Sequence, residues 1–156
     1  MNYCFAADRT LGKLVKWLRI MGFDTTFESG ISTQRFYERL EPERILLTRT
    51  AKIRAQFADR SLVFIKADTV YEQLRQVVND LAITRRNIHL FSMCLRCNSP
   101  IVELDKQAVS GRVPDYIWQT HDEFSQCRLC ERIYWAGSHG ERSREVIEHL
   151  FDEKRP

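Results

Sequence analysis

The chain has 156 residues, enough for one ordinary domain or for a domain of about 90 residues followed by a small metal-stabilised module. Its 44% hydrophobic and 29% charged residues are typical of a soluble globular protein and argue against a disordered one. No apolar run approaches the roughly 20 residues that span a bilayer, and the start has no basic segment followed by an apolar one. We therefore expect a cytoplasmic protein.

The basic residues are concentrated in the first part of the chain. Residues 1–90 contain 15 Lys and Arg against 10 Asp and Glu, whereas residues 91–156 contain 9 against 11. This surplus favours a phosphate-bearing partner for the first part. An Arg-rich solvated surface would give the same count, so charge alone does not decide between the two.

The first predicted elements are a strand and an amphipathic helix. The apolar run from Tyr3 to Ala7 has the length of a buried strand and stops at Asp8. Apolar residues then recur at helical spacing until Gly22 ends the helix: Leu11, Leu14, Val15, Leu18 and Met21. The opposite side of this helix carries basic residues that we expect to face solvent: Arg9, Lys13, Lys16 and Arg19.

Short apolar strands alternate with helical segments as far as residue 88. The pattern predicts strands at 23–27, 45–47 and 62–65, and helices at 33–40, 51–58 and 68–81. At the start of the last helix, Thr69 and Glu72 have the spacing of a capping box. This alternation is typical of βαβ crossovers and of a mainly parallel sheet that is covered on both faces. We therefore assign residues 1–88 to an α/β domain.

Two Cys-x-x-Cys pairs dominate residues 89–156. Cys94 with Cys97, and Cys127 with Cys130, can supply the four thiolates of a closed tetrahedral zinc site, and the 29 residues between the pairs indicate a long-looped zinc ribbon. A closed site has no open coordination position, so the zinc should stabilise structure and perform no chemistry. The alternative is that the four are ordinary reduced core thiols. A ribbon strand at 133–135 and a closing helix at 142–151 complete this part.

Candidate catalytic residues come at the ends of predicted strands. Ligands of open α/β sheets bind beyond the carboxyl ends of the strands, where this chain has Asp8, Thr48 to Thr50 and Asp68. Carboxylates there would suit Mg²⁺ or Mn²⁺, which can activate water for phosphodiester hydrolysis. Asp24 lies within the second strand segment. Each acid also has a structural alternative, since Asp8 and Asp68 could cap helices and Asp24 could begin a turn.

Three stretches of the chain carry a resemblance to a known family. The first runs from Phe5 to Leu14 and continues at 17–19 and 22–25, and the second is 44–49. The third comprises both cysteine pairs and the run from Tyr134 to His139. Together they resemble the motifs of the Mut-seven C-terminal RNase family, in the family's order, from about residue 5 to residue 139. The resemblance implies a PIN-like (Rossmannoid) α/β domain with a parallel sheet, an appended zinc ribbon, and metal-dependent cleavage of RNA at an acidic centre.

From this resemblance we expect particular residues to act on RNA. Asp8 would be a catalytic ligand of Mg²⁺ or Mn²⁺, with Asp24 as its helper. Lys13, Lys16 and Arg49 would contact RNA phosphates.

Two departures from the family pattern concern the acidic centre. The middle motif normally ends Thr-Arg-Asp, whereas this chain has Thr50, and an acidic residue early in the preceding helix is replaced by Ser32 and Thr33. Threonine brings neither the charge of a carboxylate nor its affinity for Mg²⁺. Glu28 or Asp68 could substitute geometrically. The sequence therefore predicts either a weakened metal-dependent ribonuclease or an inactive module of the same fold that binds RNA or a protein.

Overall fold

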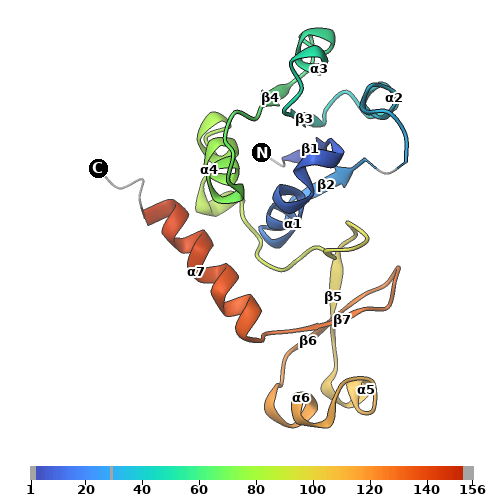
Figure 1. Cartoon of the computed structure of the whole chain (residues 1–156). Helices are drawn as coiled ribbons and strands as arrows, with labels where there is room; N and C mark the ends of the chain where they lie inside the picture. The colour runs from blue at the N-terminus through green and yellow to red at the C-terminus, as the bar shows by residue number, and fades with distance from the viewer. Residues whose placement is uncertain (1–2, 29, 153–156) are drawn as a thin grey trace. The chain divides into compact units, whose positions relative to one another are not determined.

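The computed structural model describes residues 3–28 and 30–152, and the chain divides into two compact units between Phe91 and Ser92 (Figure 1). This division lies close to the boundary predicted after residue 88. The first unit contains a parallel four-stranded sheet with helices, and the second contains a smaller antiparallel sheet and a cluster of four cysteines. The predicted fold class, an α/β domain with a parallel sheet followed by a cysteine-rich unit, is confirmed.

The sheet of the first unit is built from parallel strands in the order β2-β1-β3-β4. Their bounds are Cys4–Ala7 for β1, Asp24–Phe27 for β2, Ile45–Thr48 for β3 and Leu62–Phe64 for β4. The last residue of β1, Ala7, is level with Phe27 on one side and with Leu47 on the other. Because the chain leaves β1 to one side for β2 and returns on the other side as β3, the strand order reverses at β1. Such switch points are where open α/β sheets bind ligands.

Helices cover both faces of this sheet. After β1 a 3₁₀ turn, η1 (Arg9–Leu11), leads into α1 (Gly12–Ile20), and the later helices are α2 (Thr33–Glu38), α3 (Ala51–Gln56), α4 (Val70–Asp80) and η2 (Arg85–Asn87). α1 and α4 pack against each other on one face, and α2 and α3 lie on the other (Figure 1). Tyr37 of α2 and Ile53 of α3 share a buried cluster with Ala6, Leu46 and Phe57. The predicted cap of α4 is present, because the Thr69 hydroxyl accepts a hydrogen bond from the Glu72 N–H at 3.3 Å.

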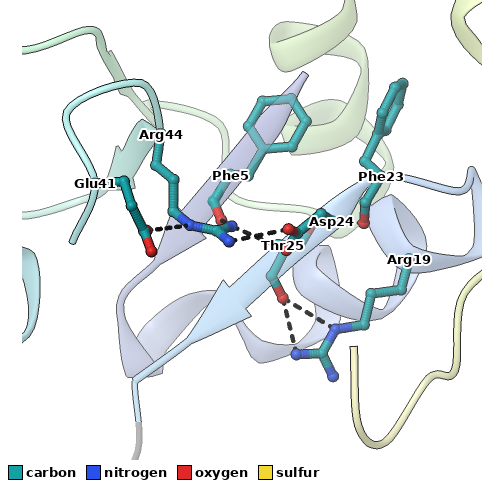
Figure 2. A network of polar contacts seen from close by, with 7 residues as sticks. All are labelled: Phe5, Arg19, Phe23, Asp24, Thr25, Glu41 and Arg44. Carbon is teal, nitrogen blue, oxygen red and sulfur yellow. Dashed lines mark hydrogen bonds and ion pairs between the residues drawn. The ribbon is translucent and has the colours of Figure 1, made fainter. Parts of the chain in front are cut away.

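The basic face predicted for α1 is only partly correct. Lys13 and Lys16 are exposed, but Arg19 is buried. Its guanidinium donates from Nε and Nη2 to the Thr25 carbonyl oxygen, at 3.0 and 2.8 Å (Figure 2). β2 is an edge strand of the described sheet. Arg19 therefore satisfies a carbonyl that has no neighbouring strand on that side, and it does not belong to the solvent-exposed face.

The second unit contains an antiparallel sheet in the order β5-β6-β7, with bounds Ile101–Leu104, Phe124–Cys127 and Ile133–Trp135. The stretch between β5 and β6 is more ordered than the predicted loop, because it forms α5 (Lys106–Val109) and α6 (Asp115–Thr120) around a small core of Val109, Ile117 and Phe124. The closing helix α7 (Ser138–Asp152) begins before the predicted residue 142. None of the helices in the described residues is both long and apolar enough to cross a bilayer.

Candidate active site and metal centre

Asp8 is buried at the carboxyl end of β1, at the switch point of the sheet. Its Oδ1 accepts hydrogen bonds from the Thr10 N–H (3.0 Å) and the Thr10 hydroxyl (2.5 Å), and its Oδ2 accepts one from the Thr48 hydroxyl (2.9 Å). The Thr48 hydroxyl also accepts a hydrogen bond from the Thr50 N–H (3.1 Å), so its one proton is directed at Asp8. Asp8 therefore caps η1, as the structural alternative predicted, and is also tied to the end of β3.

Glu28 provides a second buried carboxylate at the same edge of the sheet. It directly follows β2, and its backbone N–H donates to the Ala7 carbonyl oxygen at 3.2 Å. Its Oε1 accepts from Arg9 Nε (3.2 Å) and Nη2 (2.7 Å), and its Oε2 accepts from the Thr33 hydroxyl (2.7 Å). Burial works to raise the pKa of Glu28, but the hydrogen bonds from Arg9 and Thr33 outweigh burial and hold this pKa below its ordinary value of 4.5.

Tyr37 lies close enough to both carboxylates to feel their charges. Its side chain is fully buried, and its hydroxyl donates to the Leu47 carbonyl oxygen at 2.6 Å. Burial raises the pKa of Tyr37 far above its ordinary value of 10, and the nearby negative charges of Asp8 and Glu28 raise it further. Tyr37 is therefore a neutral hydrogen-bond donor. Its contacts connect α2 to β1, through Ala6, and to β3, through Leu46 and Leu47.

Asp24 is the first residue of β2. It lies at the amino ends of the strands, whereas Asp8 lies at their carboxyl ends. Its two carboxylate oxygens each accept a hydrogen bond from one terminal nitrogen of Arg44, both at 2.9 Å (Figure 2). The same guanidinium donates to the Phe5 carbonyl oxygen at 3.2 Å and to Glu41 at 3.0 Å. The structure therefore does not bring Asp24 and Asp8 together. Asp24 joins the starts of neighbouring strands, and its geometry gives no support to the predicted role of a catalytic helper.

The other predicted site residues lie on the surface of the first unit. The exposed carboxylate of Asp68 pairs with Arg49 at 2.6 Å and does not cap α4. Thr50 is the residue that begins α3, and its side chain makes no capping hydrogen bond. Lys13 and Lys16 are exposed on α1, and among the residues that the structure describes they have no ion-pair partner.

Asp8 and Glu28 are two buried carboxylates that follow neighbouring strands, and they do not belong to a larger acidic cluster in the described residues. Within residues 3–28 and 30–152, the only group of three or more His, Cys, Asp or Glu side chains close enough to share a metal ion is the cysteine cluster. Mg²⁺ is commonly held by one or two carboxylates together with waters and substrate phosphates. Oδ2 of Asp8 accepts one hydrogen bond, from Thr48, which leaves it a free acceptor position. The donor set therefore fits one weakly held ion.

Sequence reasoning gave Glu28 only as a possible substitute and missed the residues that orient the two acids. One signal was available, because Glu28 directly follows the predicted strand 23–27 just as Asp8 follows the first strand. The pairing of Glu28 with Arg9 and Thr33 depends on how three separate segments meet, and no local pattern in the sequence encodes it.

The four cysteines form the second site. Their Sγ atoms all lie within 4.8 Å of one another. Cys94 Sγ and Cys130 Sγ are 3.7 Å apart. This matches the edge of about 3.8 Å in a tetrahedron whose Zn–S distances are about 2.3 Å. In each pair the first sulfur accepts a hydrogen bond from the N–H of the second cysteine: Cys97 to Cys94 at 3.3 Å, and Cys130 to Cys127 at 3.5 Å. The cluster fits a tetrahedral metal ion such as Zn²⁺.

Both cysteine pairs are built on the same turn. The residue after each second cysteine has a left-handed backbone, with φ of 56° at Asn98 and 59° at Glu131. The N–H of Asn98 donates to the Cys94 carbonyl oxygen at 3.0 Å, and that of Glu131 donates to the Cys127 carbonyl oxygen at 2.8 Å. Asn adopts this conformation readily and Glu does not. The two pairs therefore present their sulfurs from the same local geometry, which suits a metal ion shared between them.

Hydrogen bonds to the sulfurs also favour a cation in this cluster. The Tyr134 hydroxyl accepts from the Leu95 N–H, so its proton is directed at Cys94 Sγ, 3.2 Å away. A hydrogen bond from Ser99 outweighs burial and lowers the pKa of Cys127 to about 6, whereas the hydrogen bond with Cys130, together with burial, raises the pKa of Cys97 to about 12. Four sulfurs this close cannot all be thiolates unless a positive ion lies among them.

The comparisons with known proteins indicate the family to which the chain belongs. The sequence model of the Mut7-C RNAse domain family matches residues 3–147. This range includes Asp8, Glu28 and all four clustered cysteines. No curated protein matches the chain.

Proposed function

The chain belongs to the Mut7-C RNase domain family, and from this premise we propose that it is a metal-dependent ribonuclease of the PIN-like type with a weakened acidic centre. One observation carries the proposal. A buried aspartate, Asp8, is oriented by Thr10 and Thr48 at the switch point of a parallel sheet, and a second buried acid, Glu28, follows the adjacent strand. RNA is the proposed substrate, and Mg²⁺ or Mn²⁺ is the proposed catalytic ion.

Asp8 would hold the ion, with Glu28 as the neighbouring negative charge. When bound, such an ion activates water and stabilises charge on the leaving oxygen of a phosphodiester. The protein's own contribution is to keep Asp8 oriented before RNA binds. The hydrogen bonds from Thr10 and Thr48 provide this orientation. Both oxygens of Glu28 already have partners. We therefore expect weak binding of the ion, completed by a phosphate of the RNA.

The exposed cations of the first unit would hold the RNA backbone. Lys13 and Lys16 are exposed one turn apart on α1. Arg49 follows β3, next to the Thr48 that bonds Asp8, and would exchange its ion pair with Asp68 for one with a phosphate. All three contacts would be independent of RNA sequence.

A second candidate function is an inactive module of the same fold that binds RNA or a protein. Two observations favour it. Thr50 brings no carboxylate where the family motif has Asp, and Arg9 occupies Glu28 with a positive charge that competes with any metal ion. Loss of cleavage with retained RNA binding would select this candidate.

Substitution of Asp8 tests the ribonuclease proposal. With Zn²⁺-loaded protein in Mg²⁺ or Mn²⁺, Asp8→Asn should lower the cleavage rate of a single-stranded RNA by about 100-fold or more. Zinc content and the unfolding midpoint should show that the variant folds. The matched control is Asp24→Asn at the opposite edge of the sheet, which removes an ion pair but should keep cleavage per folded molecule. Cleavage by Asp8→Asn at the wild-type rate would overturn the proposal.

A further inference from the structure

A cavity of about 740 Å³ lies in the second unit, among side chains of α6, β7 and the start of α7. Aromatic and basic side chains line it, chiefly Tyr116, His121, Arg132, Trp135 and His139. None of the residues that line it is Asp or Glu. The cavity therefore offers apolar ring surface and the positive charge of Arg132, with no carboxylate among its lining residues.

Several of the side chains that line this cavity have polar groups without a partner in the described residues. Tyr116 is 66% exposed and Trp135 is 38% exposed, so both rings present surface to solvent. In the described part of the chain, the Trp135 indole N–H, the Arg132 guanidinium and the His139 ring have no hydrogen-bond or ion-pair partner. Groups of this kind are available to a ligand without breaking any contact of the fold.

A second hollow of about 410 Å³ shares residues with this cavity. Arg132, Ile133 and Trp135 line both, and the second hollow adds Arg112 and one acidic residue, Glu131. Trp135 and Arg132 therefore border two adjoining depressions. Trp135 is the last residue of β7, which is an edge strand of the described sheet, and Arg132 directly precedes this strand.

The chemistry of the surface discriminates between ligands. An apolar peptide would cover the rings but would leave Arg132 and His139 unpaired. An inorganic phosphate would pair with Arg132 but would make no contact that uses the aromatic rings. A nucleotide of a single strand uses both, because its base stacks on an aromatic ring and its phosphate meets a cation. Duplex RNA keeps its bases stacked on each other and cannot present them to the rings.

We propose that Trp135, Tyr116 and Arg132 form a platform that binds unstacked bases of single-stranded RNA. The inference rests on the proposed function in that RNA is the substrate. It adds a separate contact, in the second unit, that selects single strands by stacking. The contacts proposed for Lys13, Lys16 and Arg49 are purely ionic and cannot make that selection.

The test measures binding apart from cleavage. Full-length, zinc-loaded protein carrying Asp8→Asn is titrated with a fluorescent oligouridylate of about 12 nucleotides. Adding Trp135→Ala should weaken binding by about 5- to 100-fold, and Trp135→Phe should keep most of the affinity because a ring remains. The matched control is Leu129→Ala, whose side chain is 72% exposed in the same unit but does not line the cavity. This control should bind as the parent does.

Further measurements keep the result interpretable. Zinc content and the unfolding midpoint show whether Trp135→Ala still folds, and Tyr116→Ala provides a second, more exposed variant that should also weaken binding. Inorganic polyphosphate, which has charge but no bases, should bind Trp135→Ala and the parent equally. Unchanged RNA affinity in both alanine variants, an equal loss for polyphosphate, or no RNA binding by the parent would each overturn the platform. Absence of cleavage with the platform intact would instead overturn only the ribonuclease proposal.

Discussion

At the scale of single residues, the orientation of Asp8 depends on two threonines from different parts of the chain. Thr10 is a near neighbour and bonds Asp8 within the turn that begins α1, whereas Thr48 arrives at the end of β3. Thr48 is fully buried, and its hydroxyl both donates to Asp8 and accepts from the Thr50 N–H. A valine of the same shape would leave the Asp8 oxygen and the Thr50 N–H unpaired. The hydroxyl is therefore the feature that position 48 requires.

Substitution of Glu28 should change how stability depends on pH. The folded pKa of Glu28 lies below its ordinary value, so its contribution to stability is present above about pH 4.5 and is lost as pH falls through the lowered value. At pH 7, Glu28→Gln should lower the free energy of unfolding by about 1–3 kcal/mol, because it removes charge-assisted hydrogen bonds from Arg9 and Thr33.

The measurement is urea unfolding of wild type and Glu28→Gln between pH 7 and pH 3. The stability difference should shrink as pH falls below about 4.5. Glu43→Gln, which changes an exposed acid in the same unit, is the control and should show a small, flat difference. A difference for Glu28→Gln that stays constant across this range would contradict the assigned pairing.

At the scale of elements, the sequence predicts most strands and helices of the first unit because short apolar runs and polar stops mark them. The sequence predictions fail where a residue's position depends on contacts with neighbouring elements. Arg19 matched the polar side of α1, but the edge strand β2 offers it a carbonyl oxygen and buries it. Asp24 lies in the predicted strand, but it is the first residue of that strand. It therefore lies at the amino ends of the strands, whereas Asp8 lies at their carboxyl ends. α5 and α6 are too short to show a period.

The helix α3 allows a test of the missing acid at position 50. Thr50 begins this helix without a capping hydrogen bond from its side chain, and both Asp and Asn are good residues for that position. Thr50→Asp and Thr50→Asn should therefore both raise stability by up to about 1 kcal/mol. Only Asp adds a negative charge next to the strand end that bonds Asp8. Only Thr50→Asp should strengthen Mg²⁺ or Mn²⁺ binding and increase RNA cleavage.

Calorimetric titration with Mn²⁺ and a cleavage assay distinguish the two variants. Equal gains in cleavage from Thr50→Asp and Thr50→Asn would show that helix capping, and not charge, limits the enzyme. No gain from either would favour the inactive module, because the site would then lack more than one carboxylate.

At the scale of the whole molecule, the chain is two units with different sources of stability. The first has buried apolar residues on both faces of its parallel sheet, whereas the second surrounds a few core residues, chiefly Val109, Ile117 and Phe124. A unit of this size rarely folds on its core alone. The cysteine cluster, which the spacing predicts, brings together the turn before β5 and the turn after β6. A metal ion held by this cluster would add the stability that so small a core does not provide. The proposed platform of Trp135, Tyr116 and Arg132 could not be predicted, since it depends on which side chains the small fold leaves exposed.

Metal binding should therefore decide whether the second unit folds. Metal analysis of the purified protein should give about one tightly held Zn²⁺ per chain, and Cys97→Ser should lose it. Structural zinc contributes about 10–16 kcal/mol of binding free energy, more than the stability of a small domain. Amide hydrogen exchange in Cys97→Ser should consequently show lost protection in residues 92–152, while residues 3–28 and 30–91 stay protected. The control is Cys4→Ser, because Cys4 lies in β1 outside the cluster, and this variant should keep its zinc. If Cys97→Ser retained both zinc and protection, the four cysteines would be ordinary core thiols, and the second unit would owe its fold to its apolar core.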